Sequence, residues 1–325
     1  LLVGMITVCK RPNRQPLTVQ PPSNLQTKHW GDEPIQPIPN EINLNSEKVA
    51  LGEKLFNEPQ LSKNNTISCA SCHNLELGGT DRKARSIGID NQLGDINSPT
   101  VFNSAYNFKQ FWDGRAETLE AQIDGPTHAV NEMGSDWNEI IQKLRQLSKY
   151  SFEFEKLYPD GIQTENVKDA IAEFERSLTT PDSPFDLYLR GNHEALSKEE
   201  IAGYHLFKSV GCISCHQGVN IGGNLFQEFG VMGNYFNHRG TITKADFGRF
   251  NVTQNEYDRY VFKVPSLRNV EMTPPYFHDG SAQTLPEAVG VMSKYQLGRK
   301  LSDQEIDSIV KFLKTLNGKY KRYNP

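Results

Sequence analysis

Two copies of the pattern Cys-x-x-Cys-His, at residues 69–73 and 212–216, constrain this chain more than any other feature. Cysteines three residues apart lie on one turn, where each can form a thioether with a haem vinyl group, and the next residue can bind the iron. A zinc knuckle also uses Cys-x-x-Cys pairs, but it does not need a histidine directly after each pair. We therefore predict two covalently bound haem c groups. Their protein ligands are Cys69, Cys72 and His73, and Cys212, Cys215 and His216.

Length and charge limit the other possibilities. With 325 residues the chain is about twice the length of a typical domain, so two modest domains are expected. A formal net charge of -4 gives no basic footprint, which argues against a nucleic-acid partner. Five cysteines are an odd number for a disulfide scaffold, and the two haem motifs account for four of them.

The N-terminus resembles the end of a secretory signal. Residues 1–8 are mostly apolar, too few to span a bilayer, and they stop at Cys9. The residues before Cys9 match a lipobox poorly, because a small residue is expected directly before the cysteine, so an unprocessed signal remnant is the alternative to lipidation. Haem c is attached after export, so we predict a periplasmic protein that meets the membrane only if Cys9 is lipidated.

Helical periodicity dominates the rest of the chain. Residues 10–45 are rich in Pro, Asn and Gln and predict an extended arm. Apolar residues then recur at helical spacing within 49–56, 137–147, 167–178 and 306–316. Capping boxes open helices at Ser197, Thr284 and Ser302, and Tyr260–Val264 is the best strand candidate. The fold class predicted is mainly α, with two cytochrome c-like haem domains and long loops.

A break in this periodicity suggests the domain boundary. The stretch Thr-Thr-Pro-Asp-Ser-Pro at 179–184 interrupts the helical pattern and leaves one haem motif on each side. We predict a signal remnant and arm at 1–45, a first haem domain at 46–185 and a second haem domain at 186–325.

The residues alone leave the sixth ligands of the two irons open. A sulfur opposite histidine raises the potential of haem iron, whereas an open position lets the iron bind a substrate. Met292 lies at helical spacing with Leu285 and Ala288, and such a methionine is more often part of a core than a ligand. Met232 and Met272 compete for the role.

The chain resembles the bacterial di-haem cytochrome c peroxidases, a family related to MauG, from about Leu51 to Gly318. In this family the first domain holds a low-potential peroxidatic haem and the second a high-potential electron-transfer haem. The segments that carry the resemblance are 61–68, Leu77–Asp81, Asn97–Thr100, Gln110–Glu117, Phe262–Val270, Pro275–Gly280 and Val291–Gly298.

The resemblance implies roles for individual residues. His73 and His216 are the proximal ligands, and Met292 matches the distal methionine of the electron-transfer haem. Glu132 matches a catalytic carboxylate and Gln122 a polar neighbour in the peroxide pocket, while Trp112 corresponds to an aromatic residue between the haems. A calcium site between the domains is implied at Asn97 and the carbonyls of Thr273 and Pro275. Without their matched neighbours, Glu132 would be read as a surface acid, Gln122 as a solvated helix residue and Trp112 as core packing.

The function implied is that of a peroxidase. Hydrogen peroxide would be reduced to water with electrons from a small periplasmic cytochrome c or cupredoxin, Glu132 acting as general acid and base, and the enzyme would be a homodimer. The alternatives are a MauG-like enzyme that oxidises a partner protein, and a di-haem electron carrier without enzymatic activity. MauG proteins carry tyrosine where Met292 stands, which favours the peroxidase.

One position departs from the family. Many members block the resting peroxidatic haem with a loop histidine, and the corresponding residue here is Ile89. Isoleucine cannot bind iron, so we predict an open or water-bound iron in the oxidised state and no need for reductive activation. His128, four residues before Glu132, is the candidate that could substitute.

Overall fold

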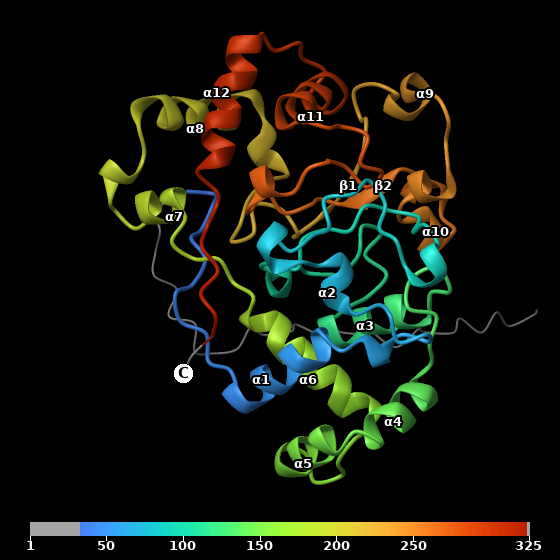
Figure 1. Ribbon diagram of the computed structural model, residues 1–325. Helices are drawn as coiled ribbons and strands as arrows, with labels where there is room; N and C mark the ends of the chain where they lie inside the picture. Colours follow the sequence, from blue (N-terminus) through green and yellow to red (C-terminus); the bar gives the residue numbers. More distant parts are fainter. Residues whose placement is uncertain (1–32, 324–325) are drawn as a thin grey trace, which may run out of the picture. The chain divides into compact units, whose positions relative to one another are not determined.

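The computed structural model describes residues 33–323, so the predicted signal remnant and Cys9 lie outside the described part. The described chain is mainly helical, as predicted, with one antiparallel pair of strands (Figure 1). None of its helices is long and apolar enough to cross a bilayer. The strands are β1 (Phe226–Glu228) and β2 (Val261–Lys263). The α-helices are α1 (Ser46–Phe56), α2 (Cys69–Cys72), α3 (Leu119–His128), α4 (Trp137–Arg145), α5 (Ser148–Leu157), α6 (Thr164–Ser177), α7 (Pro184–Leu189), α8 (Lys198–Val210), α9 (Tyr235–Arg239), α10 (Phe250–Thr253), α11 (Leu285–Val291) and α12 (Asp303–Lys314).

The first half of the chain is organised by the crossing of α1 and α6 (Figure 1). The apolar faces predicted from helical spacing are buried in both helices and belong to one hydrophobic cluster, which spans Val49 to Leu178. At the crossing, a Cβ atom on Gly52 would lie 1.9 Å from the carbonyl oxygen of Ala170. Only glycine allows the two helices to come this close.

The second half repeats this arrangement with α8 and α12. A Cβ atom on Gly203 would lie 2.1 Å from the carbonyl oxygen of Ser308, so glycine again permits the crossing. In both halves the glycine is followed by x-x-Leu-Phe and then by a Cys-x-x-Cys-His motif. The side chains around α8 and α12 form a second hydrophobic cluster. One helix pair and one motif therefore occur on each side of the predicted boundary.

The ends of the described chain link the two halves. Ile35 is fully buried and belongs to the second cluster, whereas Tyr320 and Tyr323 pack against the first. The chain thus starts on the second half and returns to the first. The boundaries at 45 and 185 remain a prediction, which the two separate clusters support.

Helix ends follow the predicted capping boxes at two of three positions. Ser197 and Ser302 each accept a hydrogen bond from the backbone of the glutamate three residues later, whose carboxylate accepts one in return. At Thr284 the side chain caps the helix, but the carboxylate of Glu287 accepts from the backbone N–H of Gln283 at 2.7 Å. The predicted strand is present as β2.

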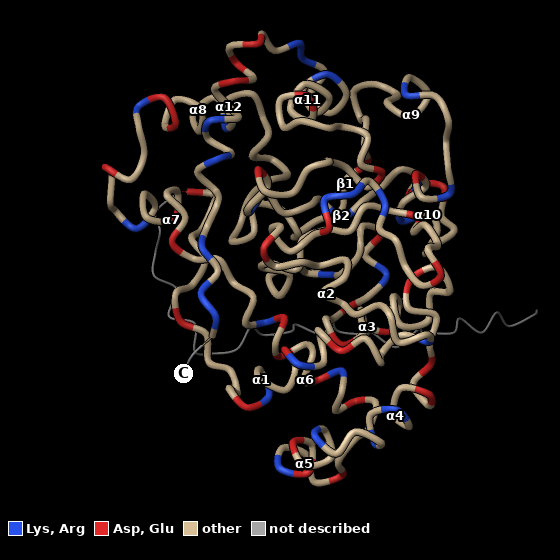
Figure 2. The backbone as a smooth tube through the Cα atoms, in the orientation of Figure 1, with Lys and Arg blue, Asp and Glu red and all other residues tan. Residues whose placement is uncertain are grey.

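Charged residues of both signs are distributed along the described chain (Figure 2). The guanidinium of Arg268 is fully buried and donates to the carboxylate of Asp186 at 2.7 Å and to the carbonyl of Gln36 at 2.9 Å. This pair joins α7, the segment after β2 and the N-terminal arm. Another buried cluster contains Asp246, which accepts from His278 at 2.7 Å and from Arg239 at 2.7 Å.

Candidate functional site

The two cysteine motifs adopt similar local geometry. Cys69–Cys72 is one α-helical turn, and Cys212–Ser214 is a 3₁₀ turn. In both motifs the backbone N–H of the histidine donates to the carbonyl of the first cysteine at 3.0 Å. Each motif therefore presents two thiols and one imidazole to a single cavity, the larger cavity for Cys212–His216 and the smaller cavity for Cys69–His73.

Both motif histidines are held in the tautomer that a metal ion requires. Nδ1 of His73 lies 3.2 Å from the carbonyl oxygen of Gly79, and Nδ1 of His216 lies 3.2 Å from that of Ile221. Because a carbonyl oxygen only accepts, each Nδ1 carries the proton and each Nε2 keeps its lone pair. Burial lowers the pKa of both imidazoles, that of His216 to about 4. Each imidazole is thus neutral and offers the lone pair of Nε2, as a metal ligand must.

The thiols differ from those of a zinc site. Burial raises the pKa of Cys69 to about 12 and that of Cys212 to about 11. Cysteine binds zinc as a thiolate, in surroundings that lower its pKa. The four motif cysteines instead remain protonated thiols beside largely apolar cavities, which suits the attachment of an apolar macrocycle.

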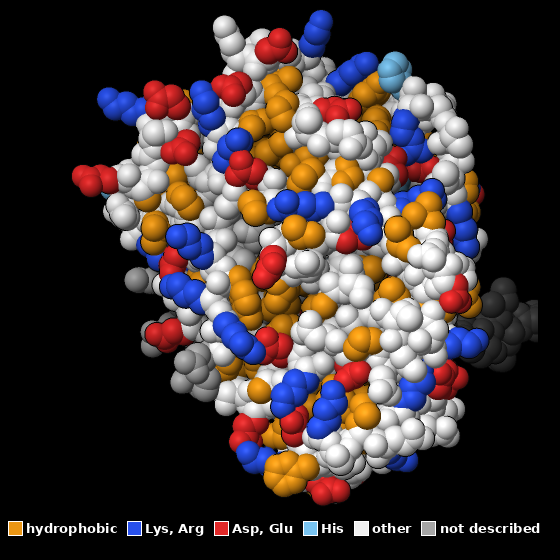
Figure 3. Space-filling model, in the orientation of Figure 1, with side chains coloured by type: hydrophobic (Ala, Val, Ile, Leu, Met, Phe, Trp, Pro, Cys, Tyr) orange, Lys and Arg blue, Asp and Glu red, His pale blue; other side chains and the backbone are white. Residues whose placement is uncertain are grey.

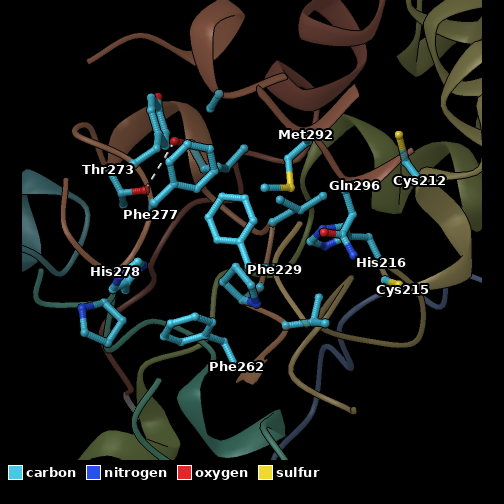
Figure 4. Close-up of a pocket in the computed structure, with 18 of the residues that line it drawn as sticks. Cys212, Cys215, His216, Phe229, Phe262, Thr273, Phe277, His278, Met292 and Gln296 are labelled. Atoms are coloured by element: carbon cyan, nitrogen blue, oxygen red, sulfur yellow. Dashed lines mark hydrogen bonds between the residues drawn. The ribbon is translucent and has the colours of Figure 1, made fainter. Parts of the chain in front are cut away.

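The larger cavity has a volume of about 250 Å³ and contains His216 together with Met292. Met292 begins a π-helical turn, Met292–Gln296, that continues α11. Such turns are rare and occur frequently at functional sites. Figure 4 shows Met292, Gln296 and His216 reaching into this cavity. The competing residues Met232 and Met272 are 62% and 37% exposed and do not line it, so of these three candidates only Met292 shares the larger cavity with His216.

Aromatic rings and aliphatic side chains form most of the remaining wall. Phe229, Phe262 and Phe277 surround the cavity in Figure 4, and His278 lies beside them. Helices α11 and α12 contribute aliphatic residues, and Figure 3 shows hydrophobic side chains at the surface between these two helices. The cavity therefore suits a flat, largely apolar ligand that takes one imidazole nitrogen.

The smaller cavity has a volume of about 150 Å³, and a larger share of its lining residues is polar or charged than in the larger cavity. It brings together His73, Gln122 from α3 and Glu132 from the loop after α3. Burial raises the pKa of Glu132; the charge of Arg115 opposes this effect and that of Asp95 reinforces it. A polar amide and a carboxyl of raised proton affinity thus share the cavity of the first motif. Its lining also contains Met133, whose side chain packs into the first hydrophobic cluster.

Neither Ile89 nor His128 reaches the smaller cavity, where a second iron ligand would lie. Ile89 is 4% exposed and does not line the smaller cavity, and its backbone N–H donates to the carbonyl of Glu132 at 2.8 Å. His128 is exposed, does not line the cavity either, and has its Nδ1 3.1 Å from the carbonyl oxygen of Ser135. The lining of the smaller cavity, all of it within the described residues, contains no histidine besides His73.

The two cavities share a wall made of residues 98–100 and Phe111. Trp112, next to this wall, lines the larger cavity and donates from Nε1 to the carbonyl of Asn97 at 3.0 Å. Asn97 is buried and lines the same cavity as Thr273 and Pro275, the three residues of the implied calcium site. Its Nδ2 donates to the carbonyl of Lys83 at 2.8 Å, which leaves Oδ1 as the acceptor of its side chain.

Sequence reasoning missed several ionisable residues of the cavities, among them Glu175 and Lys263. Glu175 is buried in the smaller cavity, and its Oε2 has no hydrogen-bond partner among the described residues. Lys263 is buried in the larger cavity. A signal existed for Glu175, because it lies four residues after Ile171 and therefore on the predicted apolar face of its helix. None existed for Lys263, which stands between Phe262 and Val264.

Comparisons with known proteins agree with this geometry. The family model described as "Di-haem cytochrome c peroxidase" matches residues 46–194. The cytochrome c peroxidase Ccp of Escherichia coli (strain K12) is 49% identical over 302 residues, which cover 93% of this chain and 64% of that protein. This chain therefore spans somewhat less than two thirds of the length of the E. coli protein.

Two further relatives cover most of both chains. The cytochrome c551 peroxidase of Nitrosomonas europaea is 47% identical over 289 residues, covering 88% of this chain and 85% of that protein. Among solved structures, a MauG-like protein associated with microbial copper homeostasis superposes with a TM-score of 0.76 at 27% identity, covering 91% of this chain and 95% of that one. The similarity to MauG-like proteins is thus lower in sequence than the similarity to peroxidases.

Proposed function

The chain belongs to the di-haem cytochrome c peroxidase family, and we propose that it reduces hydrogen peroxide to water with one haem c in each cavity. The observation that carries the proposal is the smaller cavity, where Glu132, Gln122 and the neutral imidazole of His73 share one lining. Peroxide reduction needs an iron ligand and a proton-transferring group beside the same open space. These three side chains supply the protein groups for iron binding and for proton transfer.

The donor groups of both cavities fit covalently attached haem. Cys69 and Cys72 would form the thioethers of one haem, and Cys212 and Cys215 those of the other, while His73 and His216 would bind the irons through Nε2. When bound, each haem supplies an iron that carries one electron at a time and, where a coordination position is open, binds peroxide. The protonated thiols and neutral imidazoles support this assignment.

Glu132 is the general acid and base of the reaction. Its carboxylate would take the proton from the inner oxygen of peroxide and give it to the outer oxygen, so that the O–O bond breaks and the outer oxygen leaves as water with electrons that the bound haems would supply. The raised pKa of Glu132 supports this role, because a group that both takes and gives a proton works best when its pKa approaches the working pH. Gln122 orients the peroxide by hydrogen bonding from the same lining.

A haem in the larger cavity would receive the electrons from outside. Met292 would bind its iron, and a thioether ligand would raise the potential of that haem. The donor is a small cytochrome c or a cupredoxin. Trp112, beside the wall that both cavities share, lies on the path between them.

Calcium, assembly and location complete the proposal. Asn97 and the carbonyls of Thr273 and Pro275 are hard oxygen donors of the kind that calcium prefers, and all three residues line the larger cavity. The protein works in the periplasm as a homodimer, and it is attached to the membrane only if Cys9 is lipidated.

The first haem is ready to react in the oxidised state. The loop that carries Ile89 is anchored to the backbone of Glu132, and a Cβ atom on Gly88 would lie 2.2 Å from the carbonyl oxygen of Asn131. With isoleucine at this position and His128 outside the lining, neither residue would bind an iron held by His73. Reductive activation is therefore not required.

Two alternatives are disfavoured by particular residues. A MauG-like enzyme that oxidises a partner protein would carry tyrosine in place of Met292, and the relatives named as peroxidases are the more similar ones. A pure electron carrier has no use for a carboxyl and an amide in a cavity without a second axial ligand.

The test uses the oxidised wild-type protein with both haems attached. Its electronic absorption and electron paramagnetic resonance spectra are recorded before and after addition of an equimolar amount of peroxide. A high-spin haem that reacts at once is the expected result. Two low-spin haems that become reactive only after half-reduction would contradict the open first site, and inertness in both states would favour the electron carrier.

A further inference from the structure

Lys263 occupies an unusual position in β2. Its backbone N–H donates to the carbonyl of Trp112 at 2.8 Å, so the strand holds it beside the wall between the two cavities. Its neighbours Phe262 and Val264 are buried, and Lys263 itself is only 7% exposed. It lines the larger cavity together with His216 and Met292.

The ammonium group of Lys263 has no partner among the described residues. No carboxylate lies within 4.0 Å of Nζ, and no carbonyl or side-chain oxygen of the described chain accepts a hydrogen bond from it. The other largely buried cations behave differently: Arg268 is paired with Asp186 and Arg239 with Asp246. Burial alone lowers the pKa of Lys263 to about 8, with no compensating charge nearby.

An unpaired ammonium in a largely buried side chain destabilises a protein, so a lysine in such a place is expected to meet an anion. The lining of the larger cavity contains one carboxylate, Glu228, which forms no ion pair with Lys263. We therefore look for the anion in the ligand that fills the larger cavity. Haem carries two propionate carboxylates on the edge of the macrocycle remote from the vinyl groups that cysteines bind.

We propose that Lys263 binds a propionate carboxylate of the second haem and thereby raises the potential of that haem. The inference rests on the proposed function, because it requires a haem in the larger cavity. A cation fixed close to the iron favours the reduced state, which carries one positive charge fewer. Burial keeps water from screening this effect. Lys263 is thus a positioning residue that acts together with Met292.

The experiment compares the full-length di-haem protein with three variants. Lys263→Met removes the charge at nearly constant volume, and Lys263→Arg keeps it. Lys300→Met is the matched control, because Lys300 is exposed and its charge is screened by solvent. The midpoint potential of the second haem is measured by spectroelectrochemical titration, and its propionate bending modes are recorded by resonance Raman spectroscopy.

We expect Lys263→Met to shift the reduction equilibrium of the second haem at least tenfold toward the oxidised form, a change of about 59 mV for one electron. The propionate modes should shift as well, whereas Lys263→Arg and Lys300→Met should stay within threefold of wild type. If Lys263→Met is not obtained folded, Lys263→Gln gives the same comparison.

Two results would overturn the proposal. One is a di-haem Lys263→Met protein whose potential stays within threefold of wild type. The other is a fall in potential without any change in the propionate modes, which would mean that the lysine acts through space on the iron and binds no carboxylate. Haem content is measured separately. A wild-type protein without a second haem would refute the proposed function itself.

Discussion

The two cavities start from the same Cys-x-x-Cys-His motif and differ in what faces it. The larger cavity places a thioether, Met292, and an unpaired buried ammonium, Lys263, around its imidazole. The smaller cavity is lined by several acids and amides, among them Glu132, Gln122 and Glu175. The same motif therefore faces a thioether and an ammonium in one cavity and carboxyl and amide groups in the other.

This difference shows how one motif can serve two tasks. A sulfur ligand and a nearby cation would both stabilise reduced iron, so the haem proposed for the larger cavity would suit electron storage. Carboxyl groups do not stabilise reduced iron, but they move protons and leave a coordination position free. The division of labour lies in side chains that are distant in sequence from the motifs.

Removal of the carboxyl of Glu132 is the strongest test of the difference between the two cavities. Glu132→Gln keeps the shape of the side chain but cannot transfer a proton, so we expect kcat for peroxide to fall by about 10²–10⁴-fold while the spectra of both haems are unchanged. Steady-state turnover and stopped-flow peroxide binding measure the effect. Glu155→Gln, an exposed acid in the same half, should retain full activity. Full turnover of Glu132→Gln would remove the smaller cavity from the mechanism.

The counterpart in the larger cavity is the thioether of Met292. Met292→Leu removes the sulfur at similar volume, so the second haem should lose its low-spin spectrum, and its midpoint potential should fall by on the order of 0.1 V. Absorption and spectroelectrochemistry measure both changes. Met232→Leu is the control, because Met232 is exposed and lies outside the lining. An unchanged low-spin spectrum in Met292→Leu would show that another residue is the ligand.

Local sequence patterns predict much of this molecule because they depend on neighbouring residues. The two motifs, the buried faces of α1 and α6 and the caps at Ser197 and Ser302 all follow from spacing within one or two turns. Spacing also placed Met292 on a helical face, but it could not decide between core and ligand. The π-helical turn that begins at Met292 decides where its side chain points, and it depends on tertiary packing.

The rest required contacts between distant segments. Lys263 stands in a run where both strand faces are apolar, so no alternation indicates which side is buried. The approach of α1 to α6 at Gly52 and the return of Tyr320 to the first cluster also depend on residues far apart in the chain. Glu175 lay on a predicted apolar face, but the pattern does not say that this face borders a cavity.

The last prediction tests the polar character of the smaller cavity through Glu175. Burial raises the pKa of Glu175 from 4.5 to about 8; Arg176 opposes this and Glu120 reinforces it. Between these values the folded protein holds a proton that the unfolded chain releases. The free energy of unfolding should therefore fall as the pH rises from about 4.5 to about 8, by up to about 1.4 kcal/mol per pH unit from this group.

Glu175→Gln removes this contribution because the amide stays neutral at every pH. The variant should gain stability over wild type as the pH rises from 5 to 8, which denaturant unfolding of the di-haem protein at both values measures. Glu155→Gln, where the acid is exposed, should keep the pH dependence of wild type. If Glu175→Gln also keeps that dependence, Glu175 is ionised in the folded protein, and the smaller cavity holds a buried negative charge instead of a neutral acid.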